Sequence, residues 1–174
     1  MIDNSKYLYW LRNDSDALTQ EVVWREMYSR IGSLFHIIQM VEYNIANIIS
    51  IEEYEKETKT ELDMMGIERI KAKVKLKFDQ LSDLTFGNLA KVVKQSIYLK
   101  DIDLEKLDRI KQYRDYLAHR CFKEKLLENK LSSLEDVDGF VDELNDFEVE
   151  ATEMNEWLLH IFKDNKTKSI LLKH

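Results

Sequence analysis

The sequence predicts an all-α fold, and two features lead to this prediction. The 174 residues contain no proline and only four glycines, against about 5% and 7% in an average protein, so few residues interrupt a helix. Apolar side chains recur every three or four residues over long stretches, which is the period of one helix face. We therefore expect a single domain over 1–174: an up-and-down helical bundle of four to five helices with long first and last helices.

The first half of the chain predicts an arm and two helices. Residues 1–15 form a short N-terminal arm, and Asp16 caps a long amphipathic helix that reaches about residue 57. Residues 67–84 alternate charged and apolar side chains as a strand would, but the apolar positions also fit a helical stripe. Helix is the preferred interpretation there.

The second half predicts three further helices. Thr85 begins a short helix to about residue 96, and Asp101 or Asp103 begins the next one. Ser133 and Asp136 form a capping-box pattern before the last helix. That helix is expected to reach about residue 163, followed by a polar C-terminal tail over 164–174.

Charge and composition exclude several classes of protein. A net charge of −7 predicts weak non-specific attraction to nucleic acid, so any RNA site has to be local. Cys121 is the single cysteine, which excludes an internal disulfide, and the absence of HExxH, P-loop and GxGxxG motifs predicts neither metal nor cofactor. No apolar run approaches the roughly 20 residues of a membrane span. With no signal sequence either, we expect a cytoplasmic protein without membrane contact.

The segment YRDYLAHR, residues 113–120, contains the candidate site. On a helical wheel, Arg114 falls near the centre of the apolar face of residues 103–122, formed by Leu104, Leu107, Ile110, Leu117, Ala118 and Cys121. A buried cation needs a carboxylate, a phosphate or a second subunit. Glu42, at the margin of the first helix's apolar stripe, is the best candidate for an internal ion pair. This structural explanation remains open beside a functional one.

The functional explanation rests on the chemistry of arginine and histidine. RNA cleavage without a metal requires a proton donor or acceptor near the 2′-OH, which histidine provides, and a cation at the phosphorane, which arginine provides. Asp115 precedes His119 by one helical turn, so we expect it to orient the imidazole. Tyr116 and Arg120 are candidate substrate contacts. A lysine row is a secondary candidate for RNA phosphates, although such runs are usually solvated faces; it consists of Lys71, Lys73, Lys75 and Lys77.

The segment RDYLAH resembles the Arg-four-residues-His motif of HEPN domains, an all-α superfamily of ribonucleases and toxins. The predicted layout is also similar, with TFGNLAKVV opening a short middle helix before the motif. The resemblance implies that Arg114, Asp115 and His119 match the family's arginine, polar residue and histidine. It implies a metal-independent endoribonuclease acting on RNA as a homodimer, as a toxin or antiviral effector, with a cognate antitoxin or defence protein as partner. One toxin subgroup has Tyr where this chain has Cys121, so nucleotide transfer to that tyrosine is not implied.

Geometry favours two chains for such a site. Residues five apart on a helix are turned by about 140° and displaced by about 7.5 Å, so Arg114 and His119 of one chain do not converge on one phosphate. We therefore expect a homodimer through residues 104–121, in which the partner covers the face centred on Arg114.

Three alternatives remain. The pair Arg30 and His36 has a similar spacing in the first helix, but Ile31, an apolar residue, follows the arginine. A non-catalytic HEPN-like module would bind RNA, nucleotide or a protein partner. A purely structural helical adaptor is the third possibility.

Overall fold

The computed structural model describes residues 17–58, 64–82, 84, 86–127 and 134–171. Within these ranges the chain is all-α, as predicted, with five α-helices, one π-helical segment and no strand. The predicted arm over 1–15 and the predicted caps at Asp16, Thr85 and Ser133 lie outside the described residues. The elements are α2 (Ala17–Thr58), α3 (Met64–Ser82), α4 (Phe86–Val93), α5 (Leu104–His119), η1 (Phe122–Leu127) and α6 (Leu134–Leu171).

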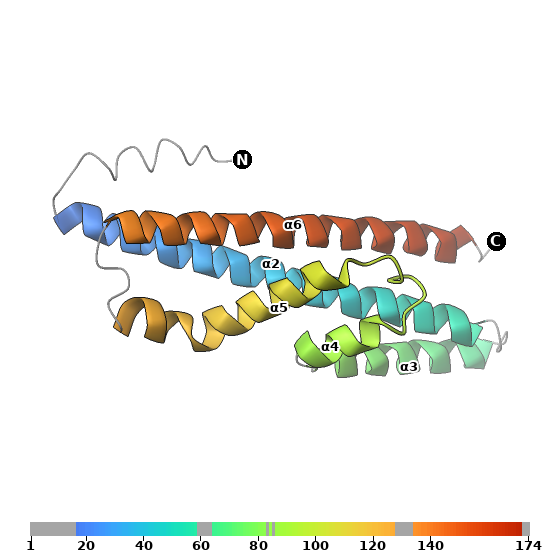
Figure 1. Cartoon of the computed structure of the whole chain (residues 1–174). Helices are drawn as coiled ribbons and strands as arrows, with labels where there is room; N and C mark the ends of the chain where they lie inside the picture. Colours follow the sequence, from blue (N-terminus) through green and yellow to red (C-terminus); the bar gives the residue numbers. More distant parts are fainter. Residues whose placement is uncertain (1–16, 59–63, 83, 85, 128–133, 172–174) are drawn as a thin grey trace.

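The two longest helices, α2 and α6, lie side by side and run in the same direction (Figure 1). Arg30 of α2 contacts Glu148 of α6 at 3.3 Å, and Asn44 of α2 donates a hydrogen bond to Asn155 of α6 at 2.8 Å. Residue numbers therefore increase in the same direction along both helices. Helices α3 and α5 run the opposite way (Figure 1). The result is an up-and-down bundle in which α5 and α6 pack antiparallel.

The core follows the predicted apolar stripes. The hydrogen bond between Asn44, which is buried, and Asn155, which is half-buried, fixes the register of α2 against α6, because an unpaired buried amide is unfavourable. Most of the apolar side chains in the core come from three helices, and α3 and α4 add Leu81, Phe86, Leu89 and Val93. The larger set includes Met27, Leu34, Ile38, Val41, Ile45 and Ile48 of α2, Leu107, Ile110 and Leu117 of α5, and Phe140, Leu144, Ala151, Met154 and Leu158 of α6.

Several helix boundaries differ from the sequence expectations; α4, for example, ends at Val93 instead of near residue 96. The ambiguous segment is helical, as preferred, and forms α3 over Met64–Ser82. Helix α6 continues to Leu171 instead of ending near residue 163. Residues 164–171 contain no proline or glycine, so nothing in them terminates a helix.

Helix α2 is more apolar than the sequence analysis expected. Its section Arg25–Glu57, 33 residues, is long and apolar enough to cross a membrane, by length and composition alone. The expectation that no stretch meets this criterion was wrong. Half of the most apolar stretch of this section is buried inside the bundle. The core helix of a soluble bundle can have the same length, composition and burial.

Glu52 of α2 anchors the connection that leads into α5. Its carboxylate accepts a 2.6 Å hydrogen bond from the Ser96 hydroxyl and a 3.0 Å bond from the Ile97 N–H, and it forms a 2.7 Å ion pair with Lys56. Burial opposes the ionisation of Glu52, but these partners outweigh burial and lower its pKa. Tyr98 adds a hydrogen bond to Glu55 one turn later. The start of α5 is thereby held against α2.

We predict that Glu52→Gln lowers the free energy of unfolding by about 1–3 kcal/mol at neutral pH, because charge-assisted hydrogen bonds are lost. The pKa of Glu52 is lower in the folded chain, so its stabilisation is present above its unfolded value of 4.5 and is lost as the pH falls through the folded value. Denaturant unfolding of both proteins as a function of pH measures this. A difference that stays constant on acidification would contradict the assignment.

Candidate functional site

Helix α5 begins after Asp103, one of the two predicted starting positions, and contains the motif near its end. The Asp103 carboxylate accepts a 2.9 Å hydrogen bond from the Lys106 N–H, which is an N-cap. The helix ends at His119, where the Arg120 N–H donates to the Tyr116 carbonyl. The widened π-helical turn η1 follows immediately, so His119 and Arg120 lie where the regular helix breaks.

The buried face of α5 is turned relative to the prediction. Tyr113 is buried with Leu107, Ile110 and Leu117, whereas Leu104 is 41% exposed and Ala118 is also exposed. The face therefore lies further toward Tyr113, and Arg114 falls at its edge with 33% of its side chain exposed. The prediction that Arg114 occupies the centre of this face was wrong, because a tyrosine on the wheel was not counted as apolar.

The chain itself covers this face. Leu107, Ile110 and Leu117 pack into the core that α2 and α6 share. The apolar part of the face that we expected a partner to cover is therefore covered by the chain itself, and a partner remains a prediction for the accessible side. The charged and polar side chains of the motif lie on the remaining, solvent-accessible face.

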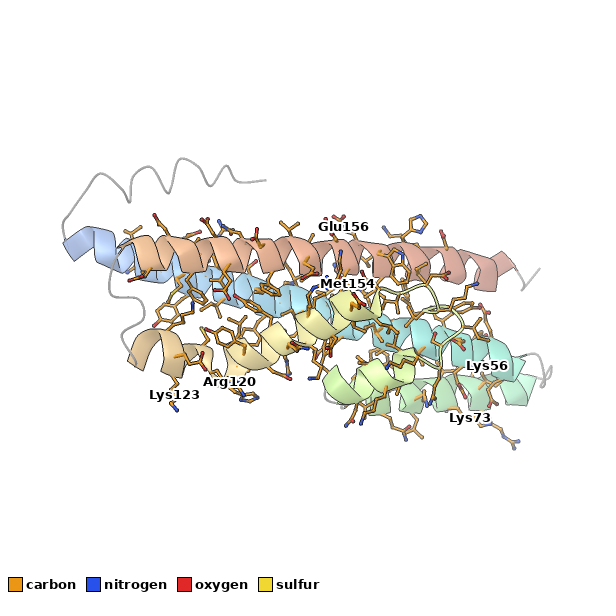
Figure 2. All side chains as sticks on the ribbon, viewed as in Figure 1. Lys56, Lys73, Arg120, Lys123, Met154 and Glu156 are labelled. Carbon is orange, nitrogen blue, oxygen red and sulfur yellow. The ribbon has the colours of Figure 1, made fainter. Side chains whose placement is uncertain are left out.

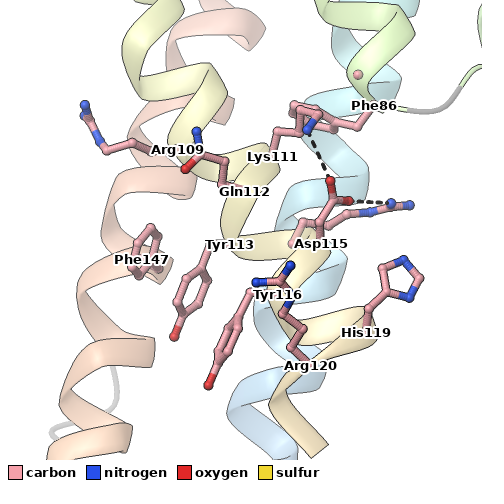
Figure 3. A pocket seen from close by; sticks show the side chains of 12 residues that line it. Phe86, Arg109, Lys111, Gln112, Tyr113, Asp115, Tyr116, His119, Arg120 and Phe147 are labelled. Carbon is pink, nitrogen blue, oxygen red and sulfur yellow. Dashed lines mark hydrogen bonds and ion pairs between the residues drawn. The ribbon is translucent and has the colours of Figure 1, made fainter. Parts of the chain in front are cut away.

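A pocket of about 950 Å³ opens along that accessible face (Figure 3). Helix α4 borders it at Phe86 and Gly87, and α6 borders it at Phe147. The structure brings all five predicted motif residues to this pocket, together with side chains that the sequence analysis did not select. The motif residues are Arg114, Asp115, Tyr116, His119 and Arg120; the additional ones from α5 are Arg109, Lys111, Gln112 and Tyr113.

Asp115 connects the two cations at one side of the pocket. One carboxylate oxygen accepts from Lys111 Nζ at 3.2 Å, and the other accepts from Arg114 Nη1 at 3.3 Å (Figure 3). Burial disfavours the ionised form of Asp115, but both hydrogen bonds favour it and lower the pKa of Asp115 overall. Asp115 is therefore ionised at neutral pH and holds both cations.

His119 is exposed and has no such partner. In the part of the chain that the structure describes, no hydrogen bond or ion pair engages its ring. The prediction that Asp115 orients the imidazole was wrong, because both Asp115 oxygens face Lys111 and Arg114 instead. The ring nitrogens of His119 are accessible to a bound substrate.

Glu42 does not form the proposed ion pair with Arg114. The nearest carboxylate partner of Arg114 is Asp115, while Glu42 acts on it only at longer range. Burial raises the pKa of Glu42, the positive charge of Arg114 lowers it, and the negative charge of Asp115 raises it; the sum is a raised value. Arg114 is therefore not the ion-pair partner of Glu42.

Aromatic side chains form the other side of the pocket. Tyr113 stacks on Phe147 with ring centroids 3.6 Å apart, and Tyr116 follows at 5.7 Å from Tyr113. Burial raises the pKa of Tyr116 to about 12, so its hydroxyl stays protonated at neutral pH. Arg120 lies beside Tyr116 (Figure 3). Phe147 was beyond sequence reasoning because it belongs to α6 and matches only the core stripe.

The lysine row does not belong to this pocket. In a helix, residues two apart are turned by about 200°, so Lys71 and Lys75 lie on one side of α3 and Lys73 and Lys77 on another. Lys71 pairs with Glu68 and Lys73 with Glu57. Lys73 and Arg120 lie toward different ends of the bundle (Figure 2). The row is a solvated helix surface with local ion pairs.

In the alternative motif of α2, Arg30 and His36, the arginine has a structural role. Arg30 forms ion pairs with Glu26 at 2.9 Å and Glu148 at 3.3 Å, and Ser33 donates to the same Glu148. His36 is exposed and does not join this network. Arg30 therefore ties α2 to α6.

Charge distinguishes the pocket from the rest of the surface. Among the described residues, four cationic side chains and one carboxylate line it, in a chain whose net charge is −7, and one of the four cations, Arg109, pairs with Glu150 of α6. Across the described ranges, no three His, Cys, Asp or Glu side chains lie close enough to hold a metal ion.

No family model, curated protein or solved structure matches the chain.

We predict that Arg114→Ala lowers the free energy of unfolding by no more than about 1 kcal/mol, as expected for a partly exposed ion pair. Ile110→Ala on the same helix should cost about 2–5 kcal/mol, because it leaves a cavity in the core. Thermal and denaturant melts of both variants measure the difference. A loss of about 3–5 kcal/mol for Arg114→Ala would mean that the arginine neutralises a buried charge.

Proposed function

We propose that the chain is a metal-independent endoribonuclease of HEPN type. The observation that carries the proposal is the composition of the pocket: Arg114 and His119 open to one cationic cavity on an otherwise acidic protein. An excess of positive charge attracts a polyanion locally despite the net charge of −7. RNA supplies the polyanion and also carries the 2′-OH on which such a site acts.

The proposed roles follow from the accessibility of each group. The exposed imidazole of His119 accepts the 2′-OH proton or donates a proton to the leaving 5′-oxygen. The 2′-oxygen attacks phosphorus, the bond to the 5′-oxygen breaks, and a 2′,3′-cyclic phosphate forms. Arg114 stabilises the negative charge on the phosphorane with its guanidinium. Asp115 positions Arg114 through the 3.3 Å hydrogen bond and does not act on His119.

The proposal includes a homodimer, but its interface differs from the one expected from the sequence. Two apolar side chains of α5 remain exposed: Leu104 at the start of the helix and Ala118 within the motif. A second copy of the chain would cover them without disturbing the buried face. Two motifs would then meet in one groove, which compensates for the different directions of Arg114 and His119 on a single helix.

The biological role that we propose is that of a toxin or antiviral effector which cleaves host RNA, controlled by an antitoxin or another defence protein. Cleavage of essential RNA arrests growth, and this role requires an active His119. A non-catalytic module that binds RNA, nucleotide or protein is the alternative. Among the residues that the structure describes, no carboxylate orients the His119 ring, which favours this alternative, since a general base usually has such a partner.

We predict RNA cleavage by the purified protein that persists in excess chelator. His119→Ala and Arg114→Ala should each lower the rate by about two to four orders of magnitude, because acid-base catalysis or charge stabilisation is lost. His36→Ala, an exposed histidine outside the pocket, is the matched control and should be fully active. Binding without cleavage would favour the alternative, and a strict need for added magnesium would contradict the mechanism.

We further predict that the active form is a dimer through the accessible face of α5. Leu104→Glu should give a monomer with much weaker cleavage, whereas Leu76→Glu, an exposed leucine of α3, should leave the dimer intact. Light scattering gives the mass, and mixing inactive His119→Ala and Arg114→Ala chains tests complementation. A stable wild-type monomer with undiminished cleavage would defeat the dimer.

A further inference from the structure

Lys111 is a pocket residue that the Arg and His motif does not include, and both parts of its side chain are constrained. Its amine contacts Asp115 Oδ2 at 3.2 Å. Its aliphatic stem lies against α4 at Gly87, where an added Cβ would come within 2.9 Å of Lys111 Cε. The absence of a side chain at Gly87 therefore leaves the space that this lysine occupies.

Charge in this part of the pocket is not balanced. Within ion-pair distance, one carboxylate, Asp115, faces the two cations Lys111 and Arg114, while Glu42, whose pKa is raised by burial, acts on Arg114 only at longer range. Both cationic side chains remain about one-third exposed, so an anion can reach them. Partly desolvated positive charge in a pocket attracts a phosphate more strongly than the same charge on an open surface.

The position of Lys111 separates it from the reacting phosphate. It precedes His119 by eight residues, which is about 12 Å along the axis of α5. A phosphate beside His119 is therefore displaced from Lys111 by about that distance along the helix. A neighbouring phosphate of the same strand can contact Lys111 while the cleaved one lies in the groove that His119 of this chain shares with Arg114 of the second copy.

We propose that Lys111 forms a second phosphate subsite, positioned by Asp115 and Gly87, and that the substrate is an RNA strand with at least two successive phosphodiesters. This inference rests on the proposed function, since it places the second phosphate relative to the cleaved one. Lys111 is a substrate-binding residue in this scheme. Asp115 and Gly87 are positioning residues.

Binding of uncleavable RNA tests the subsite independently of catalysis. Dinucleotides and trinucleotides with 2′-O-methyl groups, which have one and two phosphodiesters, are titrated into wild type and variants. The second phosphodiester should tighten binding to wild type by about tenfold, the effect of one charge-assisted contact. Lys111→Met should abolish this gain and make the salt dependence of trinucleotide binding shallower by about 0.7 in log–log slope. Lys111→Arg should retain most of the gain.

Two further variants separate a local subsite from general charge. Lys106→Met removes the same charge from the same helix, but Lys106 pairs with Glu153 at 2.8 Å outside the pocket lining, so the gain should persist. Gly87→Ala keeps every charge but displaces the lysine amine, so the gain should fall. The helix should tolerate this alanine, which has the higher helix propensity.

The outcomes distinguish this inference from the proposed function. A gain that survives in Lys111→Met, or falls equally in Lys106→Met, overturns the subsite even if RNA cleavage depends on His119. Failure of wild type to bind either oligonucleotide also overturns it. A tenfold gain that depends on Lys111, in a protein that cleaves no RNA, supports the subsite and rejects the catalytic proposal.

Discussion

The fold and the candidate site both depend on the packing of α5 against α2 and α6. Leu107, Ile110, Tyr113 and Leu117 fill the core, and their helical period leaves the residues between them on the accessible face. Any rotation of α5 would bury charged side chains and expose apolar ones. The core therefore fixes the direction of Arg114, Asp115 and His119, and the anchoring of the preceding connection by Glu52 fixes where α5 begins.

Electrostatics give this face its chemical character. Acidic residues dominate the chain, but the pocket concentrates arginine and lysine around a single carboxylate, Asp115. That carboxylate is the one within ion-pair distance of both Lys111 and Arg114, so positive charge is in excess at this end of the pocket. In our account, this excess selects phosphate, while the unpaired imidazole of His119 remains available for proton transfer.

Much of the fold was predictable from the sequence. The stripes of α2 and α6 repeat over many turns, so period alone located most of their buried residues, and Asp103 was recognisable as a cap. The motif was also recognisable, and its residues do share one pocket. The partners of Asp115 were not predictable, because Lys111 and His119 both lie one turn away and the sequence does not state which one the carboxylate contacts. Gly87 and Phe147 were missed because tertiary packing alone brings them to α5.

The central claim is that this pocket cleaves RNA by attack of the 2′-OH, and the chemistry of the product ends tests it most directly. A single RNA strand is compared with the same strand carrying one 2′-deoxynucleotide at the cleavage position. The account predicts 2′,3′-cyclic phosphate and 5′-hydroxyl ends from the first strand and no cut at the substituted position in the second. Cleavage of the deoxy-substituted bond, or products with 5′-phosphate ends, would contradict it.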